Sequence, residues 1–121
     1  MKGLVFPTYQ SVFLKDFEDF KDIGKFIGGH VEIVKPMRLP YPYFMLVDEC
    51  GLMKDDSVFN IFASLLYGFN VHGGFIVGPA VIVKEDIVNG EPDIFGLDDS
   101  DLGVLNPIIK DLFNEILSQS S

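Results

Sequence analysis

The amino-acid sequence predicts a single small α+β domain, with a mixed or antiparallel sheet of about four to six strands and two or three helices. Three observations lead to this prediction. A chain of 121 residues has the length of one domain. Short apolar runs bounded by Gly and Pro recur along it, as strands do. Longer stretches repeat apolar residues every three or four positions, as amphipathic helices do.

The first half of the chain predicts strands around one helix. The strand-like segments are short apolar or alternating runs, and Pro7 and Pro36 end two of them. Residues 16–27 repeat apolar residues on one helical face, which predicts a helix, and Gly28-Gly29 supplies the left-handed residues that end it. The predicted strands are residues 2–6, 11–14, 30–34 and 43–47.

A second helix is predicted over residues 57–66, where apolar residues recur with a helical period. Asp56 or Ser57 is a suitable N-cap for it. Residues 75–83 are the most strand-like stretch of the chain, and Pro79 within them favours an edge position or a bulge.

The C-terminal third predicts a turn and a last helix. Asn89-Gly90 indicates a tight turn. Residues 98–103 predict a polar loop or a helix entry, and Asn106-Pro107 predicts an N-cap with Pro in the first turn. The apolar positions of this amphipathic helix are Leu105, Ile108, Ile109, Leu112, Phe113, Ile116 and Leu117.

Nearly all of the net charge lies in residues 85–121. This segment holds nine acidic residues and one basic residue, Lys110, a net of −8, whereas residues 1–84 hold nine acidic and eight basic residues, a net of −1, which together give −9. We therefore expect one domain over residues 1–121, with an acidic segment that ends in the last helix. Contacts to nucleic-acid backbones need Lys and Arg, so direct binding to them is not expected.

An acidic segment on an apolar body is compatible with a binding protein that covers a basic surface of a host protein, or with plain solubility. This non-enzymatic role is our leading hypothesis, and the binding should weaken with salt. The residues expected to form the acidic surface are Asp93, Asp98, Asp99 and Asp101.

The apolar content also bears on assembly and location. The mean hydropathy of +0.30 is high for a chain of this size, which favours a homodimer. No apolar run reaches the roughly 18 residues of a membrane span, and no secretory signal is evident. Cys50 is the single cysteine, so we expect a cytoplasmic protein without disulfides in the monomer.

Metal sites and cofactors are not predicted. Asp98, Asp99 and Asp101 resemble calcium ligands, but a calcium loop that began at Asp99 would place Lys110 where a bidentate Glu is needed. Two histidines and one cysteine supply a zinc site poorly.

No catalytic residues are predicted. Cys50 follows Asp48 and Glu49, and negative charge disfavours a thiolate. A hydrolase-type enzyme that uses these two carboxylates and His30 or His72 for proton transfer is the least favoured alternative.

A small-ligand site is the second hypothesis. Tyr41 and Tyr43 could stack on a planar ring, and Lys35 and Arg38 could hold an anion. With Asn60 in the second predicted helix, these residues form a candidate site for a small ligand, such as a nucleotide.

The order of the segments resembles a known family. A Gly-Gly pair opens the strand 30–34, an Asp48-Glu49-Cys50-Gly51-Leu52 turn follows the next strand, and Gly73-Gly74 leads into 75–83. Over residues 2–101 the chain resembles the domain of unknown function 3846 family of phages and bacterial mobile elements. The resemblance implies an accessory protein without established catalytic residues. Phe59-Asn60-Ile61 keeps the family's Asn but lacks the Arg that often follows it.

Overall fold

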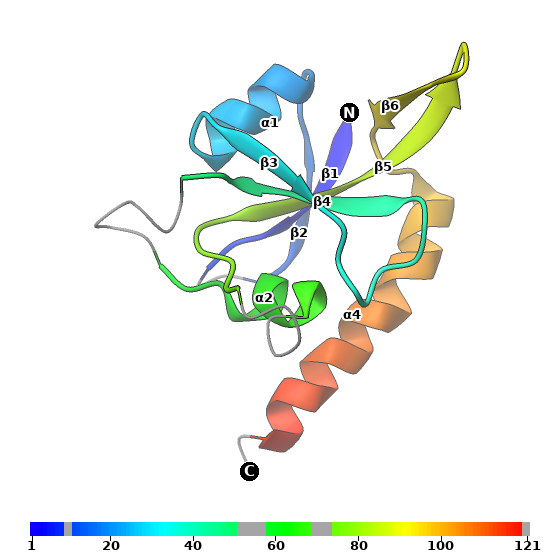
Figure 1. Ribbon diagram of the computed structural model, residues 1–121. Coiled ribbons are helices and arrows are strands. Elements are labelled where there is room, and N and C mark those ends of the chain that lie inside the picture. Colours follow the sequence, from blue (N-terminus) through cyan, green and yellow to red (C-terminus); the bar gives the residue numbers. More distant parts are fainter. Residues whose placement is uncertain (9–10, 51–57, 69–73, 120–121) are drawn as a thin grey trace.

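A computed structural model describes residues 1–8, 11–50, 58–68 and 74–119. Within these residues the chain forms a six-stranded antiparallel sheet and three helices, which confirms the predicted α+β class with a C-terminal helix. The helices are α1 (Phe20–Ile27), α2 (Ile61–Tyr67) and α4 (Asp99–Gln119). The sheet is the middle layer, with α1 on one face and α2 and α4 on the other (Figure 1).

All neighbouring strands in the sheet are antiparallel, in the order β2-β1-β5-β4-β3, and β6 pairs with the second half of β5. Because side chains alternate along each strand, the central strands are apolar on both faces and bury one set against each helical layer. The strands are β1 (Lys2–Phe6), β2 (Phe13–Asp16), β3 (Val31–Val34), β4 (Tyr43–Asp48), β5 (Ala80–Val88) and β6 (Glu91–Phe95).

The central strand is β5. Its first half lies between β1 and β4, where Ile82 pairs with Leu4 on one side and Met45 on the other. The prediction that Pro79 marks an edge position or a bulge is wrong. The strand begins at Ala80, so Pro79, which has no N–H to donate, lies just before the ladder.

The second half of β5 and β6 form a hairpin that projects from the sheet (Figure 1). The predicted tight turn at Asn89-Gly90 is confirmed, since Val88 pairs directly with Glu91 across it. Both turn residues have positive φ, 54° for Asn89 and 80° for Gly90. A type I′ turn needs this conformation, and Asn and Gly adopt it most readily.

The first helix is shorter than predicted, because residues as far as Asp16 belong to β2. The carboxylate of Asp19 accepts a hydrogen bond from the N–H of Asp22 at 2.9 Å and starts α1. Gly28 ends it with a φ of 143°, as the Gly-Gly pair predicts. Ile23 and Ile27 bury the inner face of α1 against the sheet.

The other two helices begin elsewhere than predicted. The N-cap of α2 is Asn60, so a start at residue 57 with Asp56 or Ser57 as the cap is wrong. The prediction that Asn106-Pro107 opens the last helix is also wrong, since α4 begins at Asp99 and Pro107 lies inside it. Among the described helices, none combines the length and the apolar character needed to cross a bilayer.

Candidate functional site

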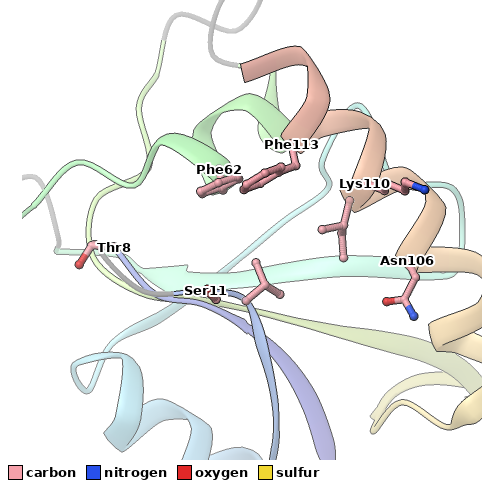
Figure 2. Close-up of a pocket in the computed structure, with 8 residues that line it drawn as sticks. Thr8, Ser11, Phe62, Asn106, Lys110 and Phe113 are labelled. Carbon is pink, nitrogen blue, oxygen red and sulfur yellow. The ribbon is translucent and has the colours of Figure 1, made fainter. Parts of the chain in front are cut away.

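A groove of about 820 Å³ lies between α2, α4 and the residues just before β2 (Figure 2). Its walls come from segments far apart in the sequence. Four of its lining residues are apolar: Val12, Phe62, Ile109 and Phe113. The other four are polar: Thr8, Ser11, Asn106 and Lys110.

The groove exists because α4 is apolar over a wider arc than the sheet covers. Leu105 and Leu112, seven residues apart, point to the core and are fully or almost fully buried. Ile109 and Phe113 lie to one side of that line, and Phe113 is 49% exposed. An amphipathic helix that only packs on a core needs an apolar stripe of roughly 100°. The additional apolar flank of α4 faces the groove.

Two aromatic rings join α2 to α4 at the groove. The rings of Phe62 and Phe113 are stacked with a centroid separation of 5.9 Å and an interplanar angle of 7°. Figure 2 shows the pair above the groove, with Ser11 below it. The stacked rings therefore form a flat apolar wall.

Among the residues that the structure describes, no carboxylate lines the groove, although the chain has 18 acidic residues. Thr8 and Ser11 offer hydroxyl groups, Asn106 offers an amide, and Lys110 carries a positive charge. No carboxylate of the described residues forms a salt bridge with Lys110. The described lining of the groove is thus weakly polar and has no acidic side chain, in a protein that is acidic as a whole.

Two of the predicted ligand residues are buried and hydrogen-bonded within the protein. Asn60 has no exposed surface; its amide donates to the carbonyl oxygens of Phe6 at 2.7 Å and Gly78 at 2.9 Å. Its side-chain oxygen accepts from the N–H of Ala63 at 3.1 Å. Tyr43 is 7% exposed, and its hydroxyl donates to Asp101 at 2.7 Å. Both side chains hold elements together.

The remaining predicted ligand residues lie nearer the surface. Arg38 forms a bidentate ion pair with Glu115 of α4, which raises the pKa of Arg38 and lowers that of Glu115 through the shared hydrogen bonds. Lys35 and Tyr41 line a hollow of about 170 Å³ together with Tyr43. Arg38 and Asn60 are not among its lining residues, so the predicted set does not converge on one site.

The predicted acidic surface needs a correction at Asp101, which is 6% exposed and does not belong to the surface. One oxygen of its carboxylate accepts from Tyr43, and the other accepts from Lys84 Nζ at 2.7 Å and from the N–H of Asp98 at 2.8 Å. In return Asp98 accepts from the N–H of Asp101 at 3.1 Å. The two aspartates cap α4 reciprocally.

This network shifts three pKa values. Burial, and then the hydrogen bond to Asp101, raises the pKa of Tyr43 to about 12. The hydroxyl of Ser100 and the N–H of Asp101 lower the pKa of Asp98. The hydrogen bond to Asp101 raises the pKa of Lys84. The described part of the acidic segment therefore contains a buried structural carboxylate as well as exposed ones.

Asp93, Asp98 and Asp99 are exposed, as predicted for a surface. Asp93 lies on β6 directly opposite Asp86 of β5. With Glu85 and Glu91, these two give the hairpin four carboxylates that form no salt bridge to any residue the structure describes.

The described residues contain no group of three or more His, Cys, Asp or Glu side chains placed to hold a metal ion. Of the residues in the enzyme alternative, Asp48 accepts a hydrogen bond from the N–H of Cys50 at 3.0 Å, and the N–H of Glu49 donates to the carbonyl of His30 at 2.8 Å. His72 lies outside the described residues.

The groove residues were absent from the sequence-based candidates. The sequence does contain a signal for them. The C-terminal helix has apolar residues at neighbouring positions such as Leu112 and Phe113, which is more apolar surface than one packed face needs. Comparison with protein-family models, curated proteins and solved structures finds no match.

Proposed function

We propose that this protein is a non-enzymatic binding protein, and that the groove between α2, α4 and the residues just before β2 holds an apolar small ligand. The observation that carries the proposal is a hollow of about 820 Å³ walled by four apolar side chains. Small-molecule sites have volumes of roughly 300–1,000 Å³ and a similar apolar lining with a few polar groups. Burial of apolar surface contributes roughly 25 cal/mol per Å², so the walls alone favour such a ligand.

Binding of a neutral fluorescent probe, Nile red, tests the groove. We expect saturable binding with a blue-shifted emission, and a loss of affinity of about fivefold or more in Phe113→Ser, because a large apolar contact is removed. Phe20→Ser is the matched control, since Phe20 is 39% exposed on α1, across the sheet from the groove. Equal affinity of the two variants, at matched folded fractions, would place the probe elsewhere.

The hairpin supports a second function, the one expected from the charge pattern. We propose that its four unpaired carboxylates bind a basic surface of a partner protein, as an accessory protein of a phage or mobile element would. The supporting observation is that Glu85, Asp86, Glu91 and Asp93 have no cationic partner among the described residues.

Titration with a lysine-rich peptide at two salt concentrations tests this second function. We expect affinity to fall as salt rises, and Asp86→Asn/Asp93→Asn to bind more weakly than Glu18→Gln/Asp111→Asn, which loses the same charge elsewhere. Equal weakening of the two double variants would show a general charge effect and would contradict a hairpin site.

A further inference from the structure

We infer that the ligand of the groove is a single-chain amphiphile with an anionic head group, whose chain lies against Phe62 and Phe113 and whose head is held by Lys110. This inference rests on the proposed ligand-binding function and specifies the chemistry of the ligand. Three features of the described residues support it: an uncompensated cation, an acid-free rim and an apolar wall.

The cation is uncompensated because of its place in the helix. Residues three and four positions apart are neighbours on a helix and form its ion pairs. For Lys110 these neighbours are Asn106, Pro107, Phe113 and Asn114, none of which is acidic. The one basic residue of the 85–121 segment therefore stands where no helical neighbour neutralises it.

The rim is suited to an anion rather than to a cation. Thr8 and Ser11 on one side, and Asn106 with Lys110 on the other, all carry hydrogen-bond donors, and no carboxylate lines the groove in the described part of the chain. Figure 2 shows Lys110 and Asn106 on the α4 side of the groove, with the Lys110 ammonium directed away from the two rings, and Thr8 on the opposite side. A lysine has a long flexible stem, so its ammonium can follow a head group along the rim.

The wall is suited to a hydrocarbon chain rather than to a polar molecule. Val12, Ile109 and the stacked Phe62 and Phe113 offer no side-chain polar atom, and all four line the same groove. A head group alone would leave this surface exposed to water. A cationic amphiphile would meet Lys110 with the same charge.

The test compares ligands of equal chain length that differ in the head group. Dodecanoate, dodecyl phosphate, dodecanol and dodecyltrimethylammonium are titrated below their micelle concentrations at low salt, with calorimetry as the readout. We expect the two anions to bind about two- to fivefold more tightly than the alcohol, the contribution of a partly exposed charge pair, and the cation to bind least. The tighter of the two anions identifies the head group.

Chain length and a free head group form the second arm. Decanoate should bind more weakly than dodecanoate by about fourfold for each methylene removed. Inorganic phosphate should bind far more weakly than dodecyl phosphate. Phosphate that bound as tightly as dodecyl phosphate would overturn the amphiphile assignment.

The variant that decides the assignment is Lys110→Gln, with Lys21→Gln as the matched control on α1 across the sheet. In Lys110→Gln the preference for dodecanoate over dodecanol should disappear while dodecanol affinity is retained, and Lys110→Glu should reverse the preference. Lys21→Gln should keep the wild-type preference. A preference that survives in Lys110→Gln, or that Lys21→Gln also loses, would overturn the role of Lys110.

The outcomes separate this inference from the function on which it rests. Equal binding of anion and alcohol would refute the anionic head group and leave the apolar groove intact. Binding of none of the amphiphiles or of Nile red would refute the groove as a ligand site. A second copy of the chain could also fill the groove, and sedimentation of the same samples tests this. A stable dimer that binds no ligand would show that a second copy fills the groove.

Discussion

The carboxylate of Asp101 accepts hydrogen bonds from β4 through Tyr43, from β5 through Lys84 and from the chain just before α4 through the N–H of Asp98. All of its partners are donors, which explains how a carboxylate can be 6% exposed without a large penalty. The same atoms that cap α4 also fix the helix to the sheet. The sequence around Asp101 suggests an exposed acid, but in the structure the position of α4 depends on this residue.

Asp101→Asn should destabilise the protein, because the charge that compensates Lys84 is lost and an amide N–H2 replaces one of the accepting oxygens. We expect a loss of about 1.5–3 kcal/mol in the free energy of unfolding, measured by urea denaturation. Asp99→Asn is the control, an exposed acid two residues earlier, with an expected change within about 0.5 kcal/mol. Similar losses in both variants would refute the special role of Asp101.

Tyr43 should ionise at a higher pH than an ordinary tyrosine. Its folded pKa of about 12 lies above the usual tyrosine value, so its stabilising contribution is complete below the unfolded pKa, about 10, and is lost as pH rises toward 12. Absorbance at alkaline pH should therefore show that one of the four tyrosines titrates late. Tyr43→Phe should remove this late step. An unchanged titration curve in Tyr43→Phe would assign the step to another residue.

At the scale of elements, the sequence predicts some boundaries of strands and helices more directly than others. Lys2–Phe6 and Tyr43–Asp48 were predicted within one residue, because apolar runs next to Pro define them. The start of α4 at Asp99 agrees with the helix entry that residues 98–103 offer as an alternative to a polar loop. The sequence does not decide between the two, because Asp98 and Asp101 also resemble solvated loop charges and Asn106-Pro107 imitates a cap. The edge position or bulge predicted at Pro79 is wrong because the local sequence does not show that the hydrogen bonds of β5 begin only at Ala80.

Gly90 and Gly103 provide a paired test of backbone conformation. Gly90 has a φ of 80° in the hairpin turn, whereas Gly103 lies inside α4, and a Cβ at either position meets nothing within 4 Å. Gly90→Ala should therefore cost about 1–2 kcal/mol through backbone strain alone. Gly103→Ala should stabilise the protein by about 0.5–1 kcal/mol through helix propensity. Thermal unfolding measures both, and changes of equal sign would contradict the assigned turn or helix.

At the scale of the whole molecule, the groove depends on contacts between distant segments, which no single segment of the sequence predicts. The groove requires α2, α4 and the residues just before β2 to meet, and these segments are separated by dozens of residues in the sequence. The amphipathic pattern of α4 shows an excess of apolar positions, but only the packing shows which of them the sheet leaves uncovered. The same reasoning explains Asn60 and Tyr43, whose polar atoms look available in the sequence and are used inside the fold.

The net charge of −9 should make the stability of the whole molecule depend on salt. Like charges repel in the compact state, and the Debye length falls from roughly 30 Å at 0.01 M to 10 Å at 0.1 M, so sodium chloride should raise the Tm. Asp86→Lys changes the net charge to −7 and replaces the Asp86–Asp93 apposition with an attractive pair. It should raise the Tm at low salt and reduce the effect of added salt.

Glu91→Lys is the matched control for this last prediction, because it changes the net charge equally but lies opposite the apolar Val88. The Tm at low salt should rise more for Asp86→Lys than for Glu91→Lys, since only the former removes a direct cross-strand repulsion. Scanning calorimetry in sodium chloride gives both values. A Tm that falls with salt in the wild type would mean that attractive pairs such as Arg38–Glu115 outweigh the repulsion among the acids.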